Sequence, residues 1–344
     1  MRIPVCRCRR CGRRSQGRHP AQVSDALGAA SSQVGPRAVA FAAALHHEGG
    51  LSLARTAAAL RRLGVEVTPA GLSHALARLG RRSQPTYEAM KRALATSPVV
   101  SPDETGWRIG GEKAWLWVFA TTLMTVYHVA RGRGFAQATE VLPAGFVGTL
   151  VRDGWAAYRG YTAATHQSCL AHWVRRCSEL CESLPEAHRW VAANAKVVLQ
   201  TALEARDLRA AGQMSDEELA AVVAELGRSV DKLVGLPVAH DDNRRLLGHL
   251  RTERHALFRF LTTPGVDATN WRAEHGVRGP VVNRKTWGGN RTDAGAATLE
   301  VVASVLRTAN QQGLDLMAVL GDLLRSPVPI VAPFAGLDPR PPPA

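Results

Sequence analysis

The sequence has 344 residues and a formal net charge of +14, from 43 lysines and arginines against 29 acidic residues. This length is enough for two or three units with cores of their own, and a hydrophobic content of 46% is that of a globular protein. No run approaches the roughly 18–20 apolar residues that span a bilayer, and the basic residues 1–20 lack the apolar core of a secretory signal. We therefore expect no membrane partner, and six cysteines without a disulfide framework favour a cytoplasmic setting.

The positive charge is concentrated in the first 100 residues. These hold 16 lysines and arginines and 4 acids, a net charge of +12, whereas the other 244 residues hold 27 and 25, a net charge of +2. A basic segment ahead of a nearly neutral body is typical of a nucleic-acid-binding module. A general arginine bias of the coding sequence is the alternative explanation, but such a bias would not stop at residue 100.

Residues 1–20 form an arm that is rich in arginine and cysteine. Cys6, Cys8 and Cys11 precede Gly12 with the spacing of half a zinc knuckle, in which thiolates on a tight turn share one tetrahedral ion. His19 is the candidate for the fourth ligand, so Zn²⁺ is a candidate cofactor of this arm. The alternative is an arm whose arginines contact phosphates without a metal.

Residues 36–82 have the pattern of a small helical unit. A first helix is predicted over 36–47, a second begins at the N-cap Ser52, and a third begins at Thr68 with a proline in its first turn. Two helices joined by a short turn that contains glycine are typical of a helix-turn-helix DNA-binding unit. We predict that side chains on its outer face contact DNA, namely Arg55, Arg61, Arg62, Ser73, His74 and Arg78.

Residues 83–97 predict a linking helix, and residues 98–172 predict the first part of an α/β core. Runs rich in β-branched and aromatic residues predict strands over 99–103, which leads into 104–107, over 114–122 and over 124–130. Helical spacing follows over 135–142, and further strands are predicted over 148–152 and 165–170. The expected fold is thus an α/β protein with a five-stranded sheet.

The rest of the chain predicts helices. Residues 173–264 have helical spacing throughout and predict an all-α insertion, in which Ser215 begins a capping box. Residues 265–324 are expected to complete the core with a helix capped by Asp267 and a last long helix that packs on the sheet. Residues 325–344 form a proline-rich tail.

Two acidic residues, Asp103 and Asp153, lie at the ends of predicted strands. A carboxylate there adds nothing to a core, and two of them at one sheet edge form a site for a divalent metal. Glu274, expected in the second turn of its helix, is the candidate third ligand; Asp293 is its main rival, and Glu253 and Glu300 are weaker competitors. Each acid also has an ordinary structural explanation, as a turn residue or, for Glu274, as an i,i+4 partner of Arg278.

Several motifs in this order resemble the insertion sequence 66 family of bacterial transposases. They are Asp-Glu-Thr-Gly-Trp at 103–107, Arg-Asp-Gly-Trp-Ala-Ala-Tyr at 152–158, Cys-Leu-Ala-His-Trp-Val-Arg-Arg at 169–176, residues 270–274, Asn-Arg-Lys-Thr-Trp at 283–287, and residues 308–315. The resemblance covers roughly residues 6–324. Trp271 and His275 stand where the family usually has asparagine and arginine.

The resemblance implies an RNase H-like core with a mixed five-stranded sheet, flanking helices and an all-α insertion. It implies that Asp103, Asp153 and Glu274 hold two Mg²⁺ ions, with Mn²⁺ as a substitute, that cleave element ends and join them to target DNA. It also implies a homo-oligomer on double-stranded DNA, with Arg284 and Lys285 bracing the DNA backbone. For Cys169 and His172 it implies a structural or strand-handling role.

Two other functions fit the same motifs. One is a metal-dependent nuclease of the same fold without strand transfer, which an assay with paired element ends would separate from a transposase. The other is a DNA-binding relic of a mobile element without catalysis. The presence of all three carboxylates argues against a relic.

Overall fold

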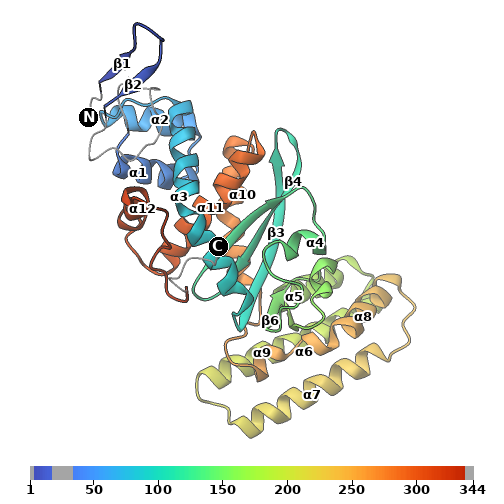
Figure 1. Ribbon diagram of the computed structural model, residues 1–344. Helices are drawn as coiled ribbons and strands as arrows, with labels where there is room; N and C mark the ends of the chain where they lie inside the picture. Colours follow the sequence, from blue (N-terminus) through green and yellow to red (C-terminus); the bar gives the residue numbers. More distant parts are fainter. Residues whose placement is uncertain (1–3, 18–33, 338–344) are drawn as a thin grey trace. The chain divides into compact units, whose positions relative to one another are not determined.

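The computed structural model describes residues 4–17 and 34–337 (Figure 1). The chain divides into two compact units. One consists of residues 1–95, 104–133 and 275–344, and the other of residues 96–103 and 134–274. The boundary crosses a strand between Asp103 and Glu104, so both units are built from segments that are distant in the sequence.

A mixed sheet is formed by β3 (Val99–Ile109), β4 (Glu112–Ala120), β5 (Thr125–Ala130), β6 (Thr149–Arg152) and β7 (Thr165–Ser168). Its strand order is β5-β4-β3-β6-β7, with β4 antiparallel to β5, and β6 parallel to both β3 and β7. The predicted five-stranded α/β sheet is confirmed. The strand β3 is longer than predicted, so Asp103 lies within it rather than at its end. It ends only where Gly110 and Gly111, with φ values of +62° and +87°, allow a tight turn directly into β4.

The first unit begins with a small hairpin, β1 (Val5–Arg7) and β2 (Arg14–Gln16), followed by three helices. These are α1 (Pro36–His47), α2 (Leu53–Arg62) and α3 (Pro69–Ala95). The side chains of Ser52 and Thr68 accept hydrogen bonds from backbone N–H groups at the starts of α2 and α3. Ala42, Ala57, Leu60 and Leu72 form the small core that joins the three helices.

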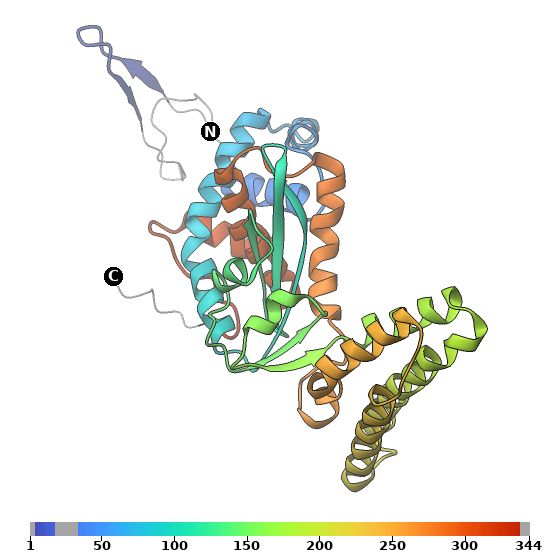
Figure 2. The ribbon, with the colours of Figure 1, turned by 90° about the vertical axis from the view of Figure 1, so that its right-hand side faces the viewer.

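The linking helix predicted over 83–97 is not a separate element, because α3 continues through Pro85 to Ala95. A proline inside a helix removes one backbone hydrogen bond and costs about 3 kcal/mol. The buried residues Tyr87, Met90 and Leu94 lie on the later turns of α3, and their burial offsets this cost. Figure 2 shows α3 running beside α11.

In the same unit, α11 (Asp293–Gln311) covers the outer edge of β5. The backbone N–H of Tyr127 donates to Ser304 Oγ at 2.9 Å, and that of Val129 donates to Glu300 Oε1 at 2.8 Å. Side chains of α11 thus satisfy donors that an edge strand leaves unpaired. The last helix, α12 (Leu316–Arg325), packs against α1 and α3.

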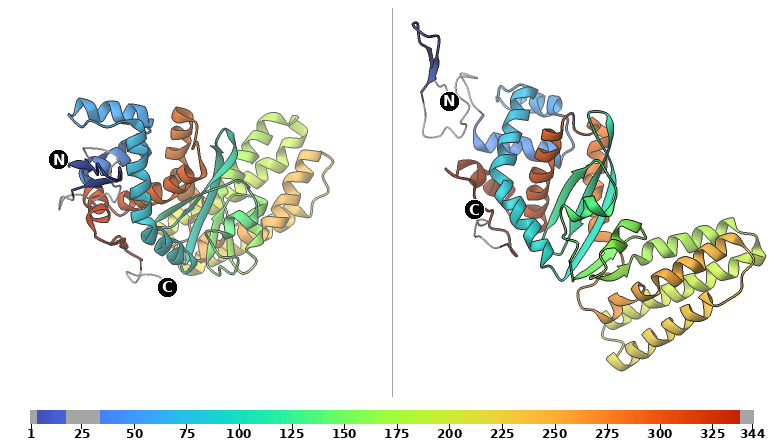
Figure 3. Two further views of the ribbon diagram at one scale, coloured as in Figure 1. Left: turned by 45° about the horizontal axis from the view of Figure 1, so that its top comes forward. Right: turned by 45° about the vertical axis from the view of Figure 1, so that its right-hand side comes forward.

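The second unit contains the all-α insertion. Its elements are α4 (Phe135–Thr139), a 3-10 helix at Ala156–Gly160, α5 (Leu170–Ser183), α6 (Glu186–Ala210), α7 (Asp216–Val234), α8 (Asp241–Glu253), a 3-10 helix at Arg254–Ala256, and α9 (Arg259–Thr262). The long helices α6, α7 and α8 lie side by side (Figure 3) around a continuous apolar core. The predicted capping box is present, since Ser215 and Glu218 each bond to the other's backbone N–H.

The remaining helix, α10 (Trp271–Trp287), begins at the end of the second unit and continues in the first. Within residues 4–17 and 34–337, none of these helices is long and apolar enough to cross a bilayer.

We expect Gly148→Ala to destabilise the protein by about 1–3 kcal/mol, the usual cost of overpacking. A Cβ atom at Gly148 would lie 2.7 Å from Ser97 O and 2.9 Å from Pro98 O, and backbone atoms cannot move aside cheaply. Gly145→Ala is the matched control, because a Cβ atom there meets nothing within 4 Å. Equal unfolding midpoints of the two variants in urea would contradict the tight contact beside β6.

Candidate active site

The register of β3 and β6 has the same offset as the separation of Asp103 and Asp153 in the sequence. In the parallel pair of β3 and β6, Val99 lies opposite Thr149 and Val100 opposite Leu150, an offset of 50 residues. Asp103 and Asp153 are separated by the same 50 residues in the sequence. The paired residues end at Val100 and Leu150, so Asp103 lies within β3 beyond the paired part, and Asp153 is the residue that follows β6. Both aspartates are half-buried, and Asp153 Oδ1 accepts a hydrogen bond from Trp155 N at 2.9 Å.

Asn270 connects the start of α10 to the same part of the sheet. Its Nδ2 donates to the carbonyl oxygen of Pro102 at 2.8 Å, one residue before Asp103. Its backbone N–H donates to Cys169 Sγ at 3.2 Å, one residue past the end of β7. Because Glu274 N donates to Asn270 O at 3.1 Å, Glu274 lies one helical turn beyond this anchor.

The start of α10 differs from the prediction. Asp267 was expected to cap this helix, but α10 begins at Trp271, which places Glu274 in the first turn rather than the second. The Asp267 carboxylate forms an ion pair with Arg272 at 2.6 Å instead. The cause is the pair of hydrogen bonds that Asn270 makes, which fixes the residue before the helix.

Glu274 approaches His172, with 3.6 Å between His172 Nδ1 and Glu274 Oε1, rather than Arg278. In the described part of the chain, Cys169, His172 and Glu274 are the one set of three metal-ligating residues whose ligand atoms lie within 4.8 Å of one another. Asp103 and Asp153 do not belong to that set.

The rival acids are engaged elsewhere. Asp293 forms an ion pair with Arg131 at 3.0 Å, on the first unit. Glu300 accepts a hydrogen bond from Val129 N and lies 3.3 Å from His128 Nδ1. Of the acids considered as the third ligand, Glu274 is the one anchored beside β3 and β7.

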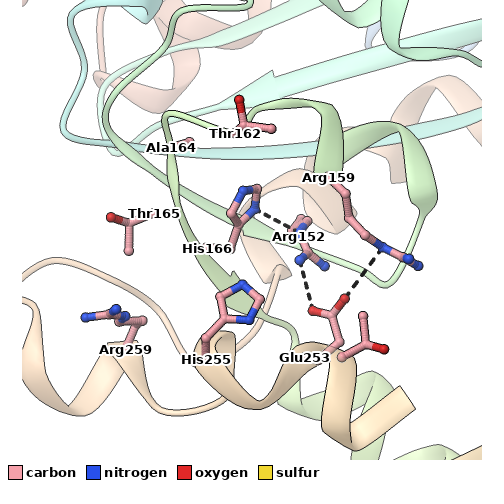
Figure 4. Close-up of a pocket in the computed structure, with 10 residues that line it drawn as sticks. Arg152, Arg159, Thr162, Ala164, Thr165, His166, Glu253, His255 and Arg259 are labelled. Carbon is pink, nitrogen blue, oxygen red and sulfur yellow. Dashed lines mark hydrogen bonds and ion pairs between the residues drawn. The ribbon is translucent and has the colours of Figure 1, made fainter. Parts of the chain in front are cut away.

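A buried ion pair supports the backbone at Asp153. Arg152 Nη2 lies 2.9 Å from Glu253 Oε2, and both side chains are almost fully buried. Arg152 also donates to His166 Nδ1 at 3.0 Å and to the carbonyl oxygen of Asp153 at 2.9 Å. Figure 4 shows Glu253 between Arg152 and Arg159, with His166 on the other side of Arg152. Burial and the neighbouring Arg152 lower the pKa of His166, so this ring is neutral and can accept the bond.

Glu253 and Arg152 were not identified as functional from the sequence. Arg152 lies in one of the family motifs, but Glu253 lies in a helix that has no chemical motif. The insertion therefore contributes directly to the support of Asp153, through the last residue of α8.

The N-terminal cysteines lie at the β1–β2 hairpin. Cys8, Cys11 and Cys6 are exposed, and Gly12 N donates to Cys8 O at 2.9 Å with a φ of +67° at Gly12. Hydrogen bonds from the backbone of Cys11 and Arg10 lower the pKa of the Cys8 thiol, as in a zinc knuckle. The three thiols do not form a set within 4.8 Å among residues 4–17, and His19 lies outside the described residues. Zinc binding by this arm remains a prediction.

The residues predicted to contact DNA differ in their exposure to solvent. Arg55, Arg61 and Arg62 are exposed on α2, and Ser73 and His74 are exposed on α3. Three further residues from the prediction differ in exposure: Lys285 is exposed, whereas Arg78 and Arg284 are half-buried. Arg284 Nη1 donates to the carbonyl oxygen of Gly106, so part of its guanidinium supports β3.

The three predicted carboxylate ligands have the chemistry that Mg²⁺ requires. Asp103, Asp153 and Glu274 offer carboxylate oxygens, the hard ligands that Mg²⁺ prefers. Asn270 Oδ1 is buried and has no hydrogen-bond partner, although its Nδ2 is bonded beside Asp103. An acceptor of this kind suits a water molecule held by a metal ion.

The mixed sheet, its flanking helices and the helical insertion define an α/β protein of the RNase H-like class. The family model "Transposase IS66 family" matches residues 31–298, and the chain belongs to this family. This confirms the resemblance inferred from the motifs.

Two relatives from Sinorhizobium fredii (strain NBRC 101917 / NGR234) are similar to the chain. "Uncharacterized protein y4qI" is 26% identical over 316 residues, which cover 84% of this chain and 58% of the relative. "Uncharacterized protein y4jO" is 23% identical over 177 residues, which cover 52% of this chain and 53% of the relative. The chain thus spans a little over half the length of these relatives.

Proposed function

We propose that the chain is the transposase of a bacterial insertion sequence, which cleaves the ends of its element and joins them to target DNA. Membership of the IS66 transposase family supports a role in transposition. The observation that carries the proposal is the parallel register of β3 and β6, whose offset of 50 residues equals the separation of Asp103 and Asp153 in the sequence. The anchoring of α10 by Asn270 supports Glu274 as the third ligand.

In this proposal Asp103 and Asp153 hold a pair of divalent ions, and Glu274 holds one of the two. Mg²⁺, or Mn²⁺ as a substitute, supplies Lewis acidity that activates water or a DNA 3′-hydroxyl and stabilises the leaving oxygen. Asn270 positions Glu274 and offers its free oxygen to a bound water. Arg152, paired with Glu253, holds the carbonyl group of Asp153 and so fixes the start of the loop after β6.

The substrate in this proposal is double-stranded DNA. Exposed arginines on α2 supply charge for phosphates, as the basic first 100 residues predict. In the second unit, a cavity of about 400 Å³ is lined by Arg159, Arg259 and His255. Figure 4 shows Arg159 and Arg259 on opposite sides of this group of residues, where their charges suit the backbone of a strand. We expect a homo-oligomer on DNA, since joining two element ends requires both to be held together.

We expect the triple variant Arg55→Ala, Arg61→Ala, Arg62→Ala to weaken DNA binding at all sequences. Each phosphate contact contributes about −0.9 to the slope of log affinity against log salt, so the slope should become shallower by roughly 2.7. The control replaces Arg206, Arg228 and Arg245, exposed arginines of α6, α7 and α8, with alanine. Fluorescence anisotropy across a salt series in the full chain measures both slopes. Equal slopes in the two triple variants would contradict the helix-turn-helix prediction.

The proposed function is tested with the purified full chain, Mg²⁺ and labelled duplexes that carry the DNA flanking the coding sequence. We expect cleavage at the element ends and joined products in a target plasmid. Cleavage without joined products, with Mg²⁺ or Mn²⁺, would replace transposition by the nuclease alternative. No cleavage with either ion, together with retained DNA binding, would support the non-catalytic alternative.

A further inference from the structure

The convergence of Cys169, His172 and Glu274 is not explained by a carboxylate site for Mg²⁺. Cys169 follows β7 and precedes α5, and His172 lies in the first turn of α5. Glu274 comes from α10, which Asn270 anchors to Cys169 Sγ. The start of α5 and the first turn of α10 thus bring a sulfur, a nitrogen and an oxygen atom of one unit within 4.8 Å of one another.

The geometry is close to that of a bound ion. Ligand atoms about 2.0–2.3 Å from a tetrahedral Zn²⁺ ion lie roughly 3.3–3.8 Å apart, so small side-chain rotations suffice to close the set. His172 Nδ1 is buried, has no hydrogen-bond partner, and lies 3.6 Å from Glu274 Oε1. That distance is too long for a good hydrogen bond but is suitable for two ligands of the same ion.

The ligand atoms of Cys169, His172 and Glu274 favour a different metal ion from the one that Asp103 and Asp153 favour. Thiolate and imidazole are ligands for Zn²⁺ and related ions, whereas Mg²⁺ prefers oxygen. Three protein ligands leave a fourth position, and Cys169 and His172 line an open cavity of about 480 Å³ from which water can fill it. A Cys-x-x-His pair alone cannot close such a site, and Glu274 supplies the missing third ligand.

We propose that Cys169, His172 and Glu274 form a zinc site that competes with the Mg²⁺ pair for Glu274. Zn²⁺ bound there holds the Glu274 carboxylate beside α5 and so inhibits DNA cleavage. The inhibition rests on the proposed transposase function, whereas the binding of the ion does not. The site acts as a metal-dependent switch on the third carboxylate of the active site.

The test uses Co²⁺ as a spectroscopic probe of the full chain. We expect His172→Gln and Cys169→Ser each to bind one ion fewer than the unchanged protein, and Cys169→Ser to lose part of the thiolate-to-Co²⁺ charge-transfer absorption. His172 is half-buried, so His172→Gln keeps the test valid if replacement of the buried Cys169 impairs folding. Cys181→Ser is the matched control on α5, and the thiols of Cys6, Cys8 and Cys11 contribute equally to every spectrum.

Inhibition is then measured as the Zn²⁺ concentration that halves Mg²⁺-dependent cleavage, relative to each variant's own rate without Zn²⁺. We expect this concentration to rise at least about tenfold in His172→Gln, which corresponds to 1.4 kcal/mol or more of lost ion binding. Equal Co²⁺ binding by the unchanged protein and both variants would overturn the site. If the variants lose the bound Co²⁺ ion but the Zn²⁺ concentration that halves cleavage does not change, the proposed competition for Glu274 is wrong. If no protein cleaves DNA, the proposed function fails, and the Co²⁺ spectra still decide the metal site.

Discussion

Asp103→Asn and Asp153→Asn should each reduce Mg²⁺-dependent DNA cleavage to background while DNA binding remains nearly unchanged. An amide lacks the negative charge that holds a divalent ion, and metal ions supply several kcal/mol of transition-state stabilisation. A loss on the order of 4 kcal/mol slows the reaction by about 10³-fold. DNA binding should persist because the exposed arginines of α2 and the rest of the basic first 100 residues are unchanged. Single-turnover cleavage and anisotropy on the same preparations measure the two quantities.

Asp207→Asn is the matched control for these variants. Asp207 is exposed on α6 and pairs with its neighbour Arg206, so its loss should leave the cleavage rate within about twofold. Cleavage at the normal rate by both active-site variants, with Mg²⁺ as the only divalent ion, would remove Asp103 and Asp153 from the mechanism.

Glu253→Ala should destabilise the protein by about 3–5 kcal/mol, the usual cost of removing one partner from a buried ion pair. Arg152 would keep its charge in a site where its side chain is 1% exposed, beside a neutral His166. This cost is a large part of the roughly 5–15 kcal/mol that stabilises a typical domain. Cleavage should fall as well, because Arg152 also holds the carbonyl oxygen of Asp153. Unfolding in urea measures the loss of stability. Cleavage, assayed at urea concentrations below the unfolding transition, measures the loss of activity.

The control for this variant is Glu225→Ala on α7. Glu225 pairs with Arg228 at 2.8 Å at the surface, and such pairs contribute only about 0–1 kcal/mol. The double variant Glu253→Leu, Arg152→Met should recover much of the stability, because apolar residues of similar volume often replace a buried pair without loss. Cleavage by the double variant should stay low if Arg152 positions Asp153. A loss of stability in Glu253→Ala no larger than that in Glu225→Ala would contradict the buried pair.

Local patterns were sufficient to predict the sheet and most helices. The strands β4 and β5 are short runs of β-branched and aromatic residues, and the capping box at Ser215 depends only on neighbours in the sequence. The lengths of the strands were predicted less accurately, because the end of β3 is set by the turn at Gly110 and Gly111. The continuity of α3 through Pro85 depends on burial against α11, which no local pattern contains.

The sequence pattern singles out candidate ligands only where an acidic residue follows a predicted strand. Asp103 and Asp153 were predicted as ligands because acidic residues at the ends of parallel strands meet at one edge, but β3 continues past Asp103 to Ile109. The proximity of Glu274 to Cys169 and His172 depends on Asn270, which joins segments about 100 residues apart. The pairing of Glu253 with Arg152 could not be predicted, since a glutamate at the end of a helix is ordinary until Arg152 is seen to be buried beside it.

The central claim is that Asp103, Asp153 and Glu274 hold a pair of divalent ions, and anomalous diffraction with Mn²⁺ tests it most directly. Crystals of the full chain with a duplex element end and Mn²⁺ would be measured at the manganese absorption edge. We predict two anomalous peaks about 3.5–4 Å apart, both in contact with Asp103 or Asp153, and one in contact with Glu274. A crystal with bound DNA and Mn²⁺ in which no peak contacts Asp103 or Asp153 would contradict the account.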